Sequence, residues 1–330
     1  MMSFDPHISR RHFGLGALSI LGTSFPLSPH RAHAANLPSI TLRVASFRGM
    51  DSTIIPAAGL ADFPYNVEFS EFNSGNLIAQ AINANAVDMG GWSEIPLVFI
   101  AASGARVKIV ATIDGPTTNQ AVVVPANSPA RSFADLKGRK VGYIRSTTAH
   151  YFLIRMLQKV GLTFADITPV PLGMSQGLTA LKSGSLDAWA TYGYVIPLLM
   201  ADGFGRILES AENILSGHYF IGANPLQLPD PNFRAAAADY INRLGKAYTL
   251  LTQNKTRWAK AISPIIQIPE PIVLSDLDAQ NRPYRIRPWN DGDIQSAQIV
   301  ADTFIEQRLI PSRPDLKSVF SNELTALLTG

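Results

Sequence analysis

The chain has 330 residues, of which 46% are hydrophobic and 16% are charged, a balance typical of a globular protein. Its length exceeds what one hydrophobic core usually organises, so we expect two lobes. It has no cysteine, which excludes disulfides, thiolate metal sites and a cysteine nucleophile. The formal net charge is only +3. The sequence shows no cluster of basic residues of the kind that predicts nucleic-acid binding.

The first 34 residues predict an export signal. Residues 9–13 read Ser-Arg-Arg-His-Phe, which resembles the first five positions of the twin-arginine signal, although the next two positions depart from it. A weakly apolar run over residues 14–27 is too short for a stable membrane anchor, and residues 32–34 read Ala-His-Ala, a small-x-small cleavage pattern. We therefore expect a periplasmic protein beginning near Ala35, exported by a twin-arginine-type signal peptide, with no membrane anchor in the mature chain.

Strands and helices then alternate. Residues 40–46 and 67–72 have the β-branched or alternating pattern of strands, and residues 52–61 and 73–84 are predicted helices. A short strand over residues 87–90 completes a β-α-β-α-β unit, an order that implies a parallel sheet.

A second unit repeats this order. After a helical turn over residues 132–138, Asp187 follows an apolar helix end and a small turn, just as Asp88 does 99 residues earlier. We interpret both aspartates as structural, because Asp favours the turn that leads into a strand. The predicted strands of this unit are residues 140–144, 167–172 and 186–190, and its helices are residues 147–160 and 175–183.

Two apolar strands outside the units, residues 120–125 and 218–223, are the expected crossings between the lobes. Residues 233–251 and 294–309 have helical spacing and would complete the first lobe, whereas residues 266–288, rich in Pro and Asp, are expected to be irregular. We divide the chain into a signal peptide over residues 1–34, a first lobe over residues 39–124 and 219–330, and a second lobe over residues 125–218.

Candidate ligand-binding residues follow the predicted strands. In a parallel α/β sheet, ligands bind where strands end and helices begin, and the free N–H groups of helix N-termini suit an anion. A cleft between two lobes is a natural place for such a site. An ordinary helix cap explains any single Ser or Thr better, but three successive hydroxyls from Ser146 onward exceed what one cap needs. The candidates are Ser46, Gly49, Ser74, Gly75, Trp92, Ser93, Ser146, Thr147, Thr148 and Tyr192.

Among the aromatic residues, Trp92 and Tyr192 fall at strand ends, where they could line a cleft and hold an organic tail, while Trp189 is expected in the core. Arg48 and Arg145 occupy equivalent strand ends, and either anion binding or a solvated surface would explain them.

No catalytic or metal-binding arrangement is found. The Gly-x-Ser-x-Gly, phosphate-loop and paired-His motifs are absent, and only His150 and His218 follow residue 34. A lone His150 inside a helix is more often a packing or polar contact than a base. We expect no enzyme activity, no cofactor and no metal.

Several motifs together resemble one family. Residues 71–75 read Glu-Phe-Asn-Ser-Gly, residues 133–141 read Phe-Ala-Asp-Leu-Lys-Gly-Arg-Lys-Val, and residues 146–153 read Ser-Thr-Thr-Ala-His-Tyr-Phe-Leu. With residues 161–167 and 183–190, they resemble the solute-binding proteins of the sulfonate, nitrate and taurine class of ABC importers, and the aliphatic-sulfonate members most closely. The resemblance covers residues 40–315.

The resemblance implies an α/β fold, the type II periplasmic binding protein, in which two mainly parallel sheets flanked by helices are joined by two crossing strands. It implies a monomer that closes on a small organic anion, expected to be an aliphatic sulfonate, and delivers it to an inner-membrane permease with its ATPase. It places Ser74, Gly75, Ser93, Thr147 and Thr148 at the ligand.

The chain departs from the family pattern at two places where ligand identity would be read. The family's Trp-Asp-Pro-Tyr is Thr-Tyr-Gly-Tyr at residues 191–194, and its Thr-Gly-Asp is Trp-Ser-Glu at residues 92–94. Taurine, nitrate or an aromatic acid are therefore open as ligands, although Trp92 and Tyr192 speak against bare nitrate. A sensor without a permease is also open. A desulfinase-like enzyme on the same scaffold is a further alternative, but such relatives use a Cys that this chain lacks.

Overall fold

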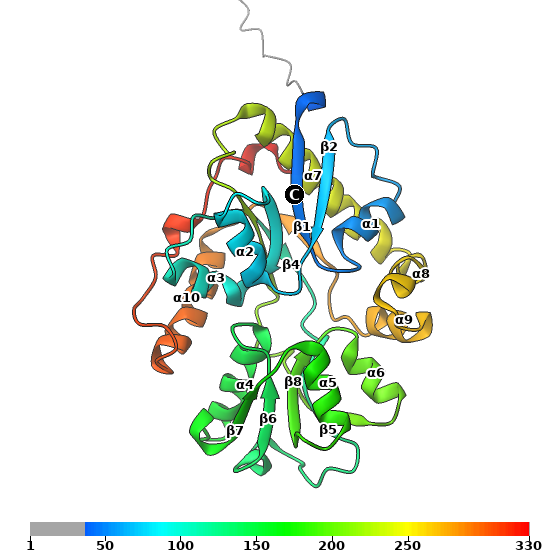
Figure 1. The fold of residues 1–330 in the computed structure, drawn as a ribbon, viewed down its shortest axis with the longest axis vertical. Coiled ribbons are helices and arrows are strands. Elements are labelled where there is room, and N and C mark those ends of the chain that lie inside the picture. The colour runs from blue at the N-terminus through cyan, green and yellow to red at the C-terminus, as the bar shows by residue number, and fades with distance from the viewer. Residues whose placement is uncertain (1–36, 330) are drawn as a thin grey trace, which may run out of the picture. The chain divides into compact units, whose positions relative to one another are not determined.

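The computed structural model describes residues 37–329, so the predicted signal peptide and its cleavage site lie outside the described residues. Its strands and helices alternate through most of this range (Figure 1). In chain order they are β1 (Thr41–Ser46), α1 (Asp51–Ala57), β2 (Asn66–Glu71), α2 (Gly75–Asn83), β3 (Met89–Ser93), α3 (Glu94–Ala102), β4 (Lys108–Asp114), β5 (Gln120–Pro125), β6 (Lys140–Tyr143), α4 (Thr148–Lys159), β7 (Thr168–Pro171), α5 (Met174–Lys182), β8 (Ala188–Tyr192), α6 (Val195–Ala201), β9 (Gly205–Ser210), β10 (His218–Ala223), α7 (Pro231–Thr252), α8 (Lys255–Ile266), α9 (Glu270–Asp278), β11 (Arg285–Arg287) and α10 (Asp291–Glu306).

Two sheets with the same internal plan organise these elements. The first has the order β11-β4-β10-β3-β1-β2 and the second the order β7-β6-β8-β5-β9. In each sheet the three strands of one repeat run parallel, which confirms the predicted β-α-β-α-β units. An antiparallel strand, β10 or β5, lies beside them, so both sheets are mixed. Two mixed sheets flanked by helices confirm the predicted two-lobed α/β fold. The expectation of mainly parallel sheets is wrong, because the strands that follow each crossing pair antiparallel with their neighbours.

The crossings exchange strands between the sheets. After β4 the chain enters the second sheet as β5, and after β9 it returns to the first sheet as β10, between β3 and β4. The linking segments, residues 115–119 and 211–217, are joined where the Gly115 N–H donates to the Gly217 carbonyl at 2.8 Å. Residues 120–124, expected in the first lobe, therefore lie in the second sheet, because β5 pairs with β8 and β9.

The segment over residues 266–288, expected to be irregular, contains α9 and β11. Two prolines at the start of α9 suggest a loop, but proline is well tolerated in the first turn of a helix. Its buried side chains then recur at helical spacing: Val273, Asp276 and Leu277. The elements α3, β4, α6, β9 and α8 have no counterpart among the predicted ones. No helix within residues 37–329 is long and apolar enough to cross a bilayer.

Candidate functional site

In the first sheet, the predicted ligand residues end strands or begin helices, as expected. Ser46 ends β1, where it is buried and its hydroxyl donates to the Phe47 carbonyl at 3.0 Å. Ser74 caps α2 by accepting a hydrogen bond from the Leu77 N–H at 3.4 Å. Ser93 ends β3 and precedes α3, and its side chain does not cap that helix. Ser93 is therefore the one of these three without a local hydrogen bond.

Trp92 packs in the core, which corrects the expectation that it lines a cleft. Its side chain is only 2% exposed. A Cβ added at Gly222 would lie 2.0 Å from the far end of the indole ring, and one added at Gly75 would lie 2.5 Å from the Trp92 Cβ. The two glycines thus leave the space that the tryptophan fills, and packing rather than a ligand explains Gly75. Trp189 is fully buried in the core, as predicted.

Gly49, after β1, also has a structural explanation. Its φ is +76°, in the left-handed region that favours glycine. A Cβ at this position would lie 2.7 Å from the Ile266 Cγ2 at the end of α8. The backbone here turns tightly against α8.

In the second sheet, the run of three hydroxyls precedes and begins α4. Ser146 has a left-handed φ of 58°, and its N–H donates to His150 Nδ1 at 3.3 Å. The Thr147 hydroxyl donates to the Ile144 carbonyl at 2.7 Å instead of capping the helix. Thr148 is 7% exposed, and its hydroxyl has no hydrogen-bond partner among residues 37–329. None of the three hydroxyls caps α4, so its first N–H groups stay available.

His150 packs beneath the segment that leads into α4 and accepts a hydrogen bond from it. Its ring lies 4.7 Å from the ring of Tyr143 and 5.2 Å from that of Phe304 on α10. Burial, with a contribution from the positive charge of Arg145, lowers the pKa of His150 to about 4. The imidazole is therefore neutral at physiological pH, and its Nδ1 is occupied by the Ser146 N–H.

A row of neighbouring polar side chains joins the two sets of strand ends. Ser93 is the cross-strand partner of Tyr219, whose hydroxyl accepts a hydrogen bond from Gln120 Nε2 at 3.4 Å. Gln120 is in turn the cross-strand partner of Tyr192. The Tyr192 hydroxyl hydrogen-bonds to Thr147, while burial raises its pKa to about 12. We call Ser93, Tyr219, Gln120, Tyr192 and Thr147 the polar row.

The polar row brings together three predicted site residues, Ser93, Thr147 and Tyr192. It adds Gln120 and Tyr219, which the sequence reasoning missed. Both are polar residues at the start of apolar strands that follow a crossing, and that position is the signal that could have found them. Arg48 and Arg145 are exposed and have no hydrogen bond or ion pair with any residue in the described range, which leaves both explanations for them open.

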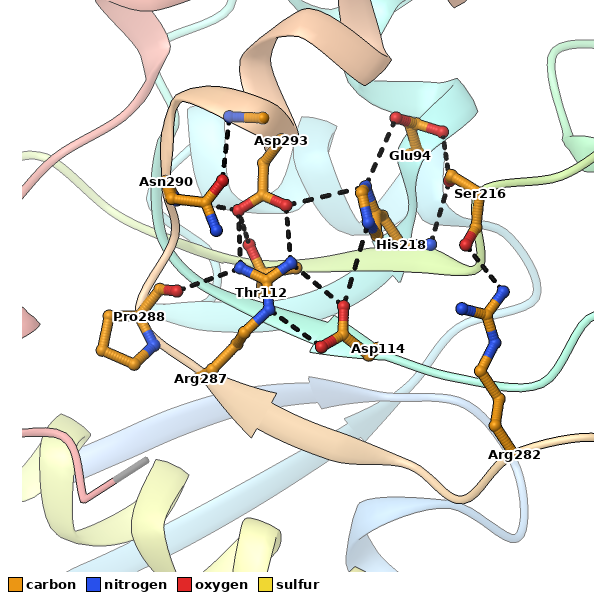
Figure 2. A network of polar contacts seen from close by, with 11 residues as sticks. Glu94, Thr112, Asp114, Ser216, His218, Arg282, Arg287, Pro288, Asn290 and Asp293 are labelled. Atoms are coloured by element: carbon orange, nitrogen blue, oxygen red, sulfur yellow. Dashed lines mark hydrogen bonds and ion pairs between the residues drawn. The ribbon is translucent and has the colours of Figure 1, made fainter.

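Glu94, the residue after Ser93, belongs to a partly buried charge network that contacts His218 at the start of β10 (Figure 2). The Arg287 guanidinium pairs with Asp114 and Asp293, with its closest contacts to each at 2.8 Å. His218 Nδ1 lies 3.6 Å from Asp293 and 3.9 Å from Glu94. Burial raises the pKa of Glu94 to about 7. This network anchors the segment that crosses back to the first sheet. Within residues 37–329, no group of three or more His, Asp or Glu side chains is arranged to hold a metal ion.

Two surface cavities lie elsewhere. One, of about 940 Å³, lies along α7 and β11, and the other, of about 180 Å³, lies near Asp135 and Asp187. Neither is lined by a candidate ligand residue. The cleft between the lobes accordingly stays a prediction.

Comparison with known proteins places this geometry in a family context. The family described as NMT1/THI5 like matches residues 65–212. An aliphatic sulfonates-binding protein of Escherichia coli is 27% identical over 252 residues, which cover 76% of this chain and 78% of that protein.

Two solved structures agree with that relationship. The alkanesulfonate-binding protein SsuA of Xanthomonas axonopodis pv. citri, bound to MOPS, has a TM-score of 0.78 and 26% identity, covering 85% of this chain and 98% of that one. The periplasmic aliphatic sulphonate binding protein SsuA of E. coli has a TM-score of 0.77 and 26% identity, covering 84% and 90%. These matches confirm the family resemblance: the chain is similar to the solute-binding proteins of the sulfonate, nitrate and taurine class, with aliphatic sulfonate-binding proteins among its relatives.

Proposed function

We propose that this chain is the periplasmic substrate-binding component of an ABC importer, which binds a small organic anion between its lobes and delivers it to a permease. The observation that carries the proposal is the polar row, because it connects strand ends of both sheets in a fold similar to that of an alkanesulfonate-binding protein solved with MOPS.

The N-terminus of α4 suits the anionic head. Its first N–H groups are not capped by a side chain, and the Thr148 hydroxyl beside them has no hydrogen-bond partner within the described residues 37–329. Backbone N–H and hydroxyl groups can donate to several sulfonate oxygens without a neutralising cation. Since Trp92 lies in the core, the aromatic contact for an organic tail falls to Tyr192 and Tyr219, and these side chains favour an organic sulfonate over bare nitrate.

Binding without chemistry fits these residues best. The polar row contains no nucleophile with a base in hydrogen-bonding reach, and the nearby His150 is neutral with Nδ1 occupied. The chain also lacks the cysteine on which a desulfinase-like relative would depend. We therefore propose a binding protein with no covalent step. That it is a monomer is proposed from the family resemblance alone.

A thermal-shift screen of the purified protein tests the ligand. Alkanesulfonates, taurine, nitrate and aromatic acids would be compared, and a ligand at 100 times its Kd should stabilise the fold by about 2.7 kcal/mol. A shift with nitrate alone, or with none of these anions, would overturn the proposal. Delivery is tested separately by sulfonate uptake in cells that have or lack the cognate permease.

The proposed export route has its own test. Replacement of Arg10 and Arg11 by Lys should leave the protein in the cytoplasm, as measured by cell fractionation. Normal export of that variant would refute the twin-arginine assignment.

A further inference from the structure

Phe304 on α10 brings a first-lobe side chain against the helix that begins the proposed anion site. Helix α10 packs on α3 in the first lobe, where the Phe304 and Phe99 rings meet edge to face with centroids 4.8 Å apart. The same ring contacts α4, which packs on the strands of the second sheet. Its centroid lies 5.2 Å from that of His150 and 6.1 Å from that of Tyr151. Phe304 is fully buried, so it fills space between helices of both lobes.

A polar contact accompanies the ring contact. Thr303, the residue before Phe304, hydrogen-bonds with the Tyr151 hydroxyl, and both residues are buried. Two successive residues of α10 thus meet two successive residues of α4, one pair through rings and the other through a hydrogen bond. Because the helices belong to different lobes, a movement that opens the lobes would break both contacts.

Three aromatic rings surround the His150 imidazole. Tyr143 lies 4.7 Å from it and Phe164 lies 5.3 Å from it, and both belong to the second lobe. Phe304, at 5.2 Å, is the third and comes from the first lobe. The second lobe therefore supplies only part of the packing that fixes the imidazole, and Phe304 completes it.

His150 passes this packing on to the loop that precedes α4. Its Nδ1 accepts the Ser146 N–H at 3.3 Å. Ser146 has a φ of 58°, a left-handed conformation that residues other than glycine seldom adopt, so it needs support from its surroundings. Two residues later α4 begins at Thr148, with the uncapped N–H groups of the proposed anion site. The position of the imidazole therefore influences the direction of those donors.

We infer that Phe304 is a positioning residue for the anion site. When the lobes close, its ring fixes the His150 imidazole, and His150 fixes the loop at Ser146 from which α4 begins. A contact made only in the closed state shifts the equilibrium toward that state, so the Phe304 ring should increase ligand affinity without touching the ligand. This inference rests on the proposed function and names a residue, distant in sequence from the hydroxyl run, on which binding depends.

Calorimetry with ethanesulfonate, butanesulfonate and MOPS tests the effect on affinity. Phe304→Leu keeps an apolar side chain but removes the ring, and it should bind the sulfonates about three- to tenfold more weakly, the value of one aromatic contact. Phe320→Leu is the matched control. Phe320 is buried in the same hydrophobic cluster, but its ring contacts are with Phe220 at 5.5 Å and Trp289 at 5.1 Å, both in the first lobe. This control should lose stability and keep the wild-type affinity.

The pKa of His150, measured by an NMR titration of the imidazole, gives a second result that needs no ligand. Burial, with a smaller contribution from the Arg145 charge, lowers this pKa to about 4, and the rings of Tyr143, Phe164 and Phe304 add no charge. Phe304→Leu should raise the pKa of His150, because the imidazole becomes more exposed to water. Phe320→Leu should leave it unchanged.

The two measurements separate the possible failures. An affinity or a His150 pKa equal to that of the wild type in Phe304→Leu would overturn this inference alone, as would equal changes of both in Phe320→Leu. Absence of sulfonate binding by the wild-type protein would overturn the proposed function, and with it the role of Phe304 in binding. Phe304→Met, whose flexible side chain retains more volume, takes the place of Phe304→Leu if that variant folds poorly.

Discussion

The Asp88 carboxylate accepts a hydrogen bond from the Arg43 backbone N–H at 2.9 Å and pairs with the Arg43 guanidinium at 2.6 Å. In the second sheet, Asp187 accepts from the Lys140 N–H at 2.8 Å. Each aspartate thus ties the turn before the third strand of its repeat to the first strand. The interpretation of the repeated aspartates as structural agrees with these bonds.

Because Asp88 is buried and ion-paired, Asp88→Asn should lower the free energy of unfolding by about 2–3 kcal/mol. Asp187 is 44% exposed at its side chain, so Asp187→Asn should cost about 1 kcal/mol or less. Urea unfolding of both variants measures the difference. Equal losses would show that burial does not decide the strength of this contact.

Gly222 leaves the space that the Trp92 indole ring fills, so a methyl group at this position should destabilise the fold. Gly222→Ala places a Cβ against the indole, and we expect a loss of about 1–3 kcal/mol of stability. Gly91→Ala is the control, because its Cβ would meet only the Phe220 carbonyl oxygen at 3.6 Å. Thermal unfolding with similar losses for both variants would contradict the packing argument.

Thr148 and Thr147 should separate binding from stability. Thr148→Ala removes a hydroxyl with no partner in the described structure, so we expect an unchanged Tm and about tenfold weaker sulfonate binding. Thr147→Ala also removes the bond to the Ile144 carbonyl and should lower both quantities. The double variant Thr147→Ala with Thr148→Ala should bind sulfonate more than tenfold more weakly. A sulfonate affinity equal to that of the wild type, measured by calorimetry, would show that these residues do not form the binding site.

Asn281 should hold the two crossing segments together. Its Oδ1 accepts from the Thr117 N–H at 3.1 Å, and its Nδ2 donates to Thr117 Oγ1 at 3.0 Å and to Glu212 Oε1 at 3.3 Å. Asn281→Ala should lower stability by about 1–2 kcal/mol, since the N–H of the fully buried Thr117 would lose its acceptor and its hydroxyl would keep only the Glu212 carbonyl. Gln280→Ala, one residue earlier, should change stability little. Equal losses of stability for Asn281→Ala and Gln280→Ala in chemical unfolding would contradict the proposal that Asn281 holds the crossing segments together.

Glu94 should make stability depend on pH. Its pKa is raised by burial to about 7 in the fold, so its contribution is full below about 4.5 and is lost as the pH rises through about 7. The free energy of unfolding of Glu94→Gln should therefore rise relative to that of the wild type as pH increases over that window, by up to about 3 kcal/mol. Unfolding at pH 4.5 and pH 8 measures the gain. The exposed Glu306→Gln should show no such trend, and a pH-independent difference for Glu94→Gln would contradict the argument.

Local patterns were sufficient for much of the fold. The periodicity of residues 147–160 and 233–251 predicted α4 and α7 to within a few residues, because helical spacing of apolar side chains records which face is buried. Periodicity could not show that residues 120–124 belong to the second sheet. An apolar strand has the same pattern whichever strands it pairs with. Here the pairing with β8 and β9 places residues 120–124 in the second sheet.

The sequence by itself determined the repeated units, their aspartates and the hydroxyl run at the start of α4. Only the tertiary structure decided that Trp92 fills a slot beside Gly222, that Gln120 and Tyr219 join the two sets of strand ends, and that Phe304 packs against His150. The reason is physical. Spacing along the chain records the period of local burial, whereas a hydrogen bond, a slot or a ring contact depends on groups that meet only when distant segments pack together.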